Sequence, residues 1–214
     1  MSFVGEDCDF QSDYKSVSSA LVAYLRQIKT ETIDKDCFAY HVIERLLEFR
    51  CLVIDFNYTN TFRQILFELI KNPKQHNLSH IKIHGSLINE DIVFGVDDKT
   101  KINKDHIFLK KSVSEHFKPS DFSTSIAECK TLMVFGHSLG ETDHMYFQKY
   151  FRSSCLSGNE NSNKQIGIYV YGESSRLNLH KQLDVLTNKQ IALFKQNNRV
   201  QFVDTSKKKA KNYK

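Results

Sequence analysis

The sequence predicts an α/β protein in which an N-terminal helical segment precedes a Rossmann-like, mostly parallel and doubly wound sheet. From Cys51 onward, short apolar runs alternate with segments of helical period, which is the pattern of strands joined by right-handed crossover helices. The run Leu132–Phe135 is apolar at every position, as in a strand buried on both faces. Several predicted strands end in Gly, Asn or His, and ligands of open α/β sheets bind at such strand ends.

Length and charge bound the class of protein. A chain of 214 residues can build one substantial core without disulfides. Five of its 30 basic residues lie in the last eight positions, so the net charge of +5 is a property of the tail. The body of the chain is neutral and no nucleic-acid partner is expected. We divide the chain into a helical segment (1–50), a Rossmann-like α/β domain (51–205) and a basic, disordered tail (206–214).

The cysteines and the apolar runs indicate the compartment. Five cysteines are scattered and none belongs to a C-x-x-C pair, which argues against a disulfide framework or a zinc site. No apolar run of about 18 residues could span a bilayer, and no signal segment opens the chain. We therefore expect a cytoplasmic protein with no metal and no membrane partner.

Apolar spacing places each element in order. Helical spacing predicts helices at 17–28, 38–47, 61–70, 103–116, 120–129, 146–151 and 176–186. Apolar runs predict strands at 51–56, 81–83, 91–94, 132–135, 166–171 and 199–203. A loop rich in Ser, Asn and Gly leads into the strand at 166–171.

The segment TLMVFGHSLGETD at 131–143 is the centre of the predicted fold. It is typical of a strand, a tight turn and the start of a helix. Gly136 and Gly140 allow conformations and close approaches that a side chain would block. Thr142 or Asp143 is placed to cap the helix that follows. The turn therefore lies at a strand tip, where a ligand would bind.

Polar or glycine residues follow four of the predicted strands. Asn57 follows the first strand, and His84 with Gly85 follows the second. The segments Gly136–Ser138 and Gly172–Glu173 follow two later strands. Because the carboxyl ends of parallel strands share one edge, we expect these residues to converge on a ligand or active site. The alternative is that each of them only caps a helix or turns the chain.

The motif GHSLG at Gly136–Gly140 also fits G-x-S-x-G, the nucleophile elbow of α/β hydrolases, with Ser138 as the nucleophile. The acid and then the base of the triad must follow it in the chain. Only His144 and His180 lie downstream; the first is adjacent to Asp143 and the second falls within a predicted helix. A serine hydrolase is therefore the less favoured alternative.

Four blocks of the sequence occur together in a known family. They are FNYTNT (56–61), IKIHGSL (81–87), DIVFGVDD (91–98) and VFGHSLGETDHMYF (134–147). In order and spacing they resemble the bacteriophage abortive infection AbiH family, and the segment from Arg176 to Asp204 resembles its C-terminal end. The resemblance covers about residues 51–204 and implies an anti-phage role. The family is in turn similar to sirtuin-like domains, which bind NAD in a Rossmann-like crevice.

The resemblance implies an NAD-binding or NAD-hydrolysing site, and hence an NAD glycohydrolase. Asn57 would match the Asn that positions water at the ribose, and His84 would match the catalytic His. A neutral His can act as a base near pH 7. The residues expected to contact NAD are Thr59, Gly85, Gly136, Ser138 and Asp143.

The family opens with a strand and an Ile-Gly-Asn-Gly-Phe-Asp turn that would hold the phosphates of NAD, and nothing like it is found in this sequence. We therefore expect the chain to correspond to the C-terminal part of a longer family member. The alternative to NAD cleavage is a non-catalytic fragment that acts as a binding module, with an unpaired strand edge that favours oligomers. The expected partners are a nucleotide and a phage-derived trigger.

Overall fold

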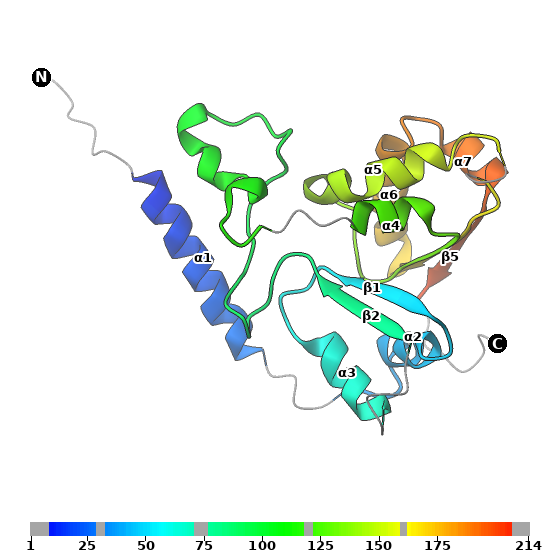
Figure 1. The fold of residues 1–214 in the computed structure, drawn as a ribbon, viewed down its shortest axis with the longest axis horizontal. Helices are drawn as coiled ribbons and strands as arrows, with labels where there is room; N and C mark the ends of the chain where they lie inside the picture. The colour runs from blue at the N-terminus through cyan, green and yellow to red at the C-terminus, as the bar shows by residue number, and fades with distance from the viewer. Residues whose placement is uncertain (1–8, 29–32, 71–76, 118–121, 159–161, 207–214) are drawn as a thin grey trace, which may run out of the picture. The chain divides into compact units, whose positions relative to one another are not determined.

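The computed structural model describes residues 9–28, 33–70, 77–117, 122–158 and 162–206 of the chain. They divide into two compact units (Figure 1). The first holds the described residues of Met1–Asp36 and Tyr40–Lys118, and the second those of Cys37–Ala39 and Pro119–Lys214. Both contain helices and parallel strands, so the prediction of a mixed α/β protein is confirmed. Nearly all of the predicted tail (206–214) lies outside the described residues, and the predicted domain boundaries stay predictions.

The first unit combines helices with a small parallel sheet. Its helices are α1 (Phe10–Gln27), α2 (Phe38–Leu46, of which Tyr40 onward belongs to this unit) and α3 (Thr61–Leu69). Its strands are β1 (Cys51–Asp55) and β2 (Leu78–Lys82). Two short 3-10 helices follow, η1 (Lys104–Leu109) and η2 (Lys111–Val113).

β1 and β2 form a parallel pair in which Cys51 lies opposite Leu78 and Asp55 lies opposite Lys82. Parallel strands need a crossover connection, and α3 supplies it. Both strands therefore end at the same edge of the sheet. The turn after β1 and the loop after β2 start side by side from this edge.

The loop after β2 turns at Gly85. This residue has φ +73°, and a Cβ there would lie 1.9 Å from the carbonyl oxygen of Asp91. Glycine is therefore required both by the left-handed backbone and by the close approach of the chain. The chain folds back at this point, so that the Val93 N–H donates to the carbonyl oxygen of His84 at 2.9 Å.

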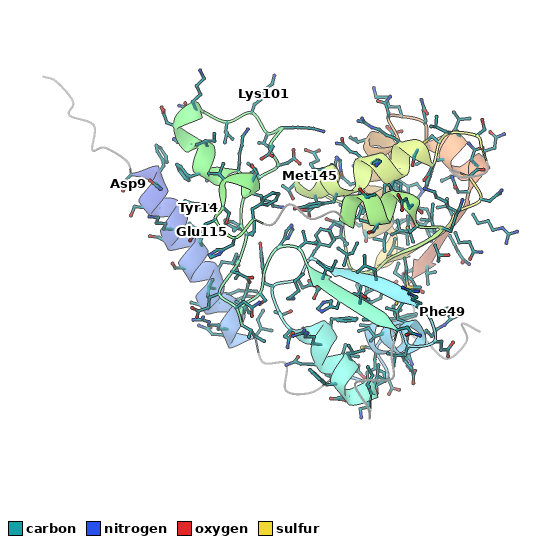
Figure 2. All side chains as sticks on the ribbon, in the orientation of Figure 1. Asp9, Tyr14, Phe49, Lys101, Glu115 and Met145 are labelled. Atoms are coloured by element: carbon teal, nitrogen blue, oxygen red, sulfur yellow. The ribbon has the colours of Figure 1, made fainter. Side chains whose placement is uncertain are left out.

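Helix α1 is attached to the same loop through Tyr14, which Figure 2 labels on that helix. The Tyr14 hydroxyl donates to the carbonyl oxygen of Phe94 at 2.5 Å, and its ring centroid lies 5.6 Å from that of Phe108. Burial raises the pKa of the Tyr14 hydroxyl, so it remains a donor at neutral pH. At the N-terminus of α1, Asp9 caps the helix by accepting a hydrogen bond from the Ser12 N–H at 3.1 Å.

The second unit is a three-stranded parallel sheet with helices packed on it (Figure 1). Its strands, in spatial order, are β3 (Thr131–Val134), β4 (Gln165–Val170) and β5 (Arg199–Asp204). Its helices are α4 (Phe122–Glu128), α5 (His144–Ser153), α6 (Gly172–Leu186) and α7 (Ile191–Asn197), with the 3-10 helix η3 (Glu141–Asp143) before α5. Because successive strands are neighbours, right-handed crossovers place α5 and α6 on the same face of the sheet.

The two faces of this sheet differ in exposure. Val134 and Ile168 are paired in register and are 5% and 0% exposed, as expected for the helix-covered face. The side chain of Met133, which precedes Val134 in β3 and points to the other face, is 43% exposed. The prediction that the strand at Leu132–Phe135 is buried on both faces is therefore wrong. The strands of the described residues form two separate sheets, so the doubly wound arrangement stays a prediction.

Two predicted elements are wrong and one helix was not predicted. The strand predicted at 91–94 is wrong, because this backbone bonds the loop at His84 and joins no sheet. The α-helix predicted at 103–116 is wrong, because the segment forms η1 and η2, with a kink at His106. Helix α7 has no counterpart in the prediction, since Phe194 is its single buried residue and gives no helical period. No helix of the described residues is long and apolar enough to cross a membrane.

Replacing Gly85 by Ala should destabilise the protein more than replacing Gly172 by Ala. The two glycines have φ +73° and +74°, but a Cβ at Gly172 would meet nothing within 4 Å. The left-handed backbone alone costs Ala about 1 to 2 kcal/mol, and the clash with Asp91 should add about 1 to 3 kcal/mol at Gly85. Urea unfolding followed by circular dichroism measures both losses. Equal losses would contradict the role given to this close approach.

Candidate functional site

A buried carboxylate lies at the edge where β1 and β2 end. Asp55 is the last residue of β1 and is 6% exposed. Its Oδ2 accepts hydrogen bonds from Lys82 Nζ at 3.0 Å and from His80 Nε2 at 3.2 Å. Both donors come from β2, because the register places Lys82 directly opposite Asp55 and His80 two residues earlier. These contacts hold the two strand ends together.

Lys82 also holds the turn that follows β1. Its Nζ donates to the carbonyl oxygens of Asn57 at 2.6 Å and of Thr59 at 2.7 Å. With Asp55 these make three acceptors, which match the three hydrogens of an ammonium group. The backbone N–H and the side-chain Nδ2 of Asn57 donate to Asp55 Oδ1 at 2.9 and 3.2 Å. The turn that carries Asn57 and Thr59 is therefore fixed on both sides.

These hydrogen bonds decide the charge of Asp55. Burial acts to raise the pKa of its carboxyl group, but hydrogen bonds from His80, the Asn57 N–H and Lys82, with the positive charge of Lys82, lower the pKa to about 2. Asp55 is thus ionised at neutral pH, and an ionised carboxylate only accepts hydrogen bonds. Its role is to orient the turn and not to deliver a proton.

His84 lies two residues beyond the end of β2 and is 7% exposed. The ring of Phe56 meets it edge-on at a centroid distance of 5.3 Å, and the ring of Tyr58 lies at 6.2 Å. Both rings come from the turn after β1. The Nζ atom of Lys111, a residue 5% exposed, lies 3.3 Å from His84 Nε2. Two aromatic rings and an ammonium group therefore lie next to the imidazole.

In the second unit, the turn after β3 carries its backbone strain at Leu139. Gly136 has φ +65° and Leu139 has φ +52°, whereas Ser138 has no positive φ. The Leu139 side chain is fully buried, which offsets the strained backbone. A Cβ at Gly140 would lie 3.2 Å from Ser138 Oγ, so this glycine leaves room for the hydroxyl.

Two histidines tie this turn together. His137 Nδ1 accepts a hydrogen bond from the Leu139 N–H at 2.9 Å, which leaves its hydrogen on Nε2, 3.4 Å from Asp143 Oδ2. His144 Nε2 lies 3.0 Å from the Leu139 carbonyl oxygen and 2.9 Å from Gln182 Oε1. Because both neighbours are acceptors, His144 Nε2 carries a hydrogen. The turn is therefore held by imidazole contacts from two positions.

The predicted site residues fall into two groups. Those of the first unit are Asn57, Thr59, His84 and Gly85, and those of the second are Gly136, Ser138 and Asp143. In the first unit the turn with Asn57 and the loop with His84 follow neighbouring parallel strands. In the second unit Asp143 holds the N-cap position of α5 but makes no side-chain hydrogen bond to the helix, so its predicted capping role is wrong. Its carboxylate faces His137 instead.

Three residues of the first unit were not recognisable as site residues from sequence. Asp55 interrupts the apolar run CLVIDF, and a carboxylate within a buried apolar run is the one signal that could have marked it. Lys82 interrupts the apolar pattern of β2 in the same way. Lys111 lies 27 residues from His84, and no local pattern indicates that they meet. Among the described residues, no three or more His, Cys, Asp or Glu side chains are grouped to hold a metal ion.

The hydrolase alternative needs a histidine whose lone pair faces the Ser138 hydroxyl. His137 uses one ring nitrogen for a backbone N–H and directs the other at Asp143. His180 Nδ1 bonds the carbonyl oxygen of Arg176 at 2.8 Å within α6. In addition, the nucleophile of such an elbow sits on a strained backbone, and here the strain falls at Leu139. These contacts remove the support for a serine nucleophile.

The described residues thus define a mixed α/β protein with polar and aromatic groups gathered where two parallel strands end. A family model described as bacteriophage abortive infection AbiH matches residues 5–158. The chain therefore belongs to the bacteriophage abortive infection AbiH family, and this membership supports a role in anti-phage defence. The matched range starts before Cys51, where the resemblance noted in the sequence begins. It ends before Arg176, so it does not include the segment from Arg176 to Asp204. No curated protein and no solved structure matches the chain.

Protonation of Asp55 should destabilise the protein in acid. The folded-state pKa of about 2 lies below the ordinary value of 3.8. The stability that Asp55 contributes is therefore complete above about pH 4 and is lost as the pH falls toward 2. Such a shift corresponds to about 2 to 3 kcal/mol. The variant Asp55→Asn should lack this part of the acid dependence.

Urea unfolding of the wild type and of Asp55→Asn, measured between about pH 2 and pH 7, tests this linkage. Glu48→Gln is the matched control, because Glu48 is an exposed carboxylate and its removal should leave the wild-type curve unchanged. An acid dependence that is the same in Asp55→Asn and in the wild type would show that Asp55 does not have the lowered pKa.

Proposed function

We propose that this member of the AbiH family cleaves NAD at the bond between nicotinamide and ribose, with Asn57 and His84 at the reacting end of the substrate. The observation that supports it most is the register of β1 and β2. Because the two strands are parallel and in register, the turn with Asn57 and the loop with His84 begin at the same edge of the sheet. Ligands of α/β proteins bind at such edges. Loss of NAD would stop the metabolism on which phage replication depends.

The aromatic rings beside His84 suit a nicotinamide riboside. Phe56 and Tyr58 supply aromatic rings next to the imidazole, and aromatic rings attract a cationic pyridinium ring. Asn57 supplies an amide without charge, on a turn that Lys82 holds in place. A site prepared in this way can position a reactant before any bond changes.

The reaction requires little proton transfer. The bond between the nicotinamide nitrogen and ribose C1′ breaks, and its electron pair stays on nicotinamide, which leaves an oxocarbenium-like ribose. A water oxygen then bonds to C1′ and loses one proton, so the products are nicotinamide, ADP-ribose and a proton. In this scheme Asn57 orients the water, and His84 contacts a ribose hydroxyl or the water.

The second unit offers features that suit a phosphate or a ribose. Gly136 has open space where a Cβ would lie, which lets a ligand approach the backbone. Ser138 supplies a hydroxyl at the same turn, and Asp143 orients His137.

Release of nicotinamide from NAD by the purified full chain tests the proposal, with and without phage lysate as the trigger. The wild type should release nicotinamide, and His84→Ala should lower the rate by at least about 100-fold, the smaller end of what a positioned catalytic group contributes. His116→Ala is the matched control. The side chain of His116 is 40% exposed. The His116→Ala variant should therefore release nicotinamide at the wild-type rate.

Three outcomes would favour another site or another function. Release that is unchanged in His84→Ala would place the reaction elsewhere. If a folded wild type binds NAD in calorimetry but releases no nicotinamide under any condition, the chain is a binding module. Activity toward esters that disappears in Ser138→Ala would instead support the hydrolase alternative.

A further inference from the structure

Lys111 places a buried positive charge against the candidate catalytic histidine. Its Nζ lies 3.3 Å from His84 Nε2, and the two residues are 5% and 7% exposed. A lysine ammonium has three hydrogens and no lone pair, so it can only donate. His84 Nε2 must therefore be the acceptor of this hydrogen bond.

Because Nε2 of His84 accepts a hydrogen bond, the position of the ring hydrogen follows. A neutral imidazole carries one hydrogen, and the nitrogen that accepts a hydrogen bond cannot be the one that carries it. The hydrogen of His84 is then on Nδ1. A general base needs a lone pair, and the lone pair of His84 is the one that the Lys111 ammonium occupies.

The backbones of both residues are attached to the segment 93–96. The Val93 N–H donates to the carbonyl oxygen of His84 at 2.9 Å, and the Lys111 N–H donates to the carbonyl oxygen of Val96 at 3.0 Å. The segment thus sets the spacing between the two side chains. The contact between the two side chains is therefore supported by backbone hydrogen bonds on both sides.

The segment 93–96 is itself held from two sides. A Cβ at Gly95 would lie 2.3 Å from the carbonyl oxygen of Leu109, so only glycine lets the Val96 N–H reach that oxygen at 2.8 Å. On the other side the Tyr58 hydroxyl donates to the carbonyl oxygen of Val93 at 3.1 Å. Tyr58, next to the imidazole, and Lys111 are therefore positioned by the same stretch of chain.

We propose that Lys111 is a positioning residue that holds His84 as the tautomer with its hydrogen on Nδ1, so that His84 donates a hydrogen bond to a substrate oxygen and removes no proton. The identity of that oxygen, a ribose hydroxyl of NAD, rests on the proposed function. The proton of the attacking water then passes to solvent. This is chemically sufficient, because water that has bonded to an oxocarbenium-like carbon loses its proton readily.

Nuclear magnetic resonance of the ¹⁵N-labelled histidine rings tests the tautomer without any need for turnover. His84 is assigned by the signal that is lost in His84→Ala. The wild type should show Nδ1 bearing a hydrogen and Nε2 without one, and Lys111→Arg should keep this pattern because Arg also only donates. Lys111→Met should shift the ring toward the Nε2–H form. Lys110→Met, at the neighbouring lysine that bonds the Asp98 carbonyl oxygen, should change nothing.

Nicotinamide release distinguishes a donor from a base. The side-chain amide of Asn places an N–H near the position of Nδ1, whereas that of Gln places it near Nε2. If His84 donates through Nδ1, His84→Asn should release nicotinamide about tenfold faster than His84→Ala and His84→Gln. This factor corresponds to the free energy of one hydrogen bond. If His84 is a base, all three variants should be equally inactive, since none can take up a proton.

Each result separates this inference from the proposed function. An Nε2–H tautomer in the wild type, or a tautomer that Lys111→Met leaves unchanged in a folded protein, overturns the role of Lys111. If Lys111→Met does not fold, Gly95→Ala, which displaces the segment 93–96, gives the same test. A tautomer that responds to Lys111 in a protein that never cleaves NAD supports the positioning role and rejects the NAD reaction. Equal inactivity of the three His84 variants, with turnover in the wild type, rejects the donor role.

Discussion

One ammonium group, that of Lys82, joins the parts of the first unit that could form a site. A sheet of two short parallel strands is weak by itself, and the ends of β1 and β2 are connected by the ion pair of Lys82 with Asp55. The same group holds the carbonyls of Asn57 and Thr59. Removal of Lys82 would leave the buried charge of Asp55 without its ammonium partner, which costs more than the pair contributes. The strand ends and the turn therefore depend on each other.

The histidines of the protein differ in their chemistry because their partners differ. His80 donates to the ionised Asp55, and this hydrogen bond links β2 to β1. His137 accepts a hydrogen bond from a backbone N–H and faces Asp143, so it stabilises the turn after β3. His84 faces a donor, Lys111, and lies next to aromatic rings. A histidine next to a glycine in a sequence therefore says little about its role until the partner of each ring nitrogen is known.

Much of the fold could be predicted because apolar spacing reports burial. The strand at 51–56 and the helix at 61–70 appear close to their predicted bounds, as do the last two strands. The strand predicted at 91–94 failed because four apolar or acidic residues cannot tell a strand from a loop that folds back at Gly85. Exposure of Met133 could not be predicted either, since an apolar run shows only that a strand prefers burial and not which faces receive helices.

The site could be predicted only in part, for a similar reason. Asn57 and His84 are visible because they follow strands, and strand ends are where parallel sheets bind ligands. Lys111 is invisible because its contact with His84 depends on two hydrogen bonds to the segment 93–96 and on the space that Gly95 leaves. Contacts of this kind are made by backbone geometry between distant residues, and no periodicity or motif records them.

The attachment of His84 and Lys111 to the segment 93–96 also governs where the chain can change in length. Insertions between Asp98 and Lys104 would only enlarge an outer loop before η1, provided that the hydrogen bonds between Val96, Leu109 and Lys111 persist. A single residue added or lost between Val93 and Val96 would alter the spacing of the two side chains at once. Chains that share this arrangement should therefore differ in length on the outer loop and keep these four residues without gaps.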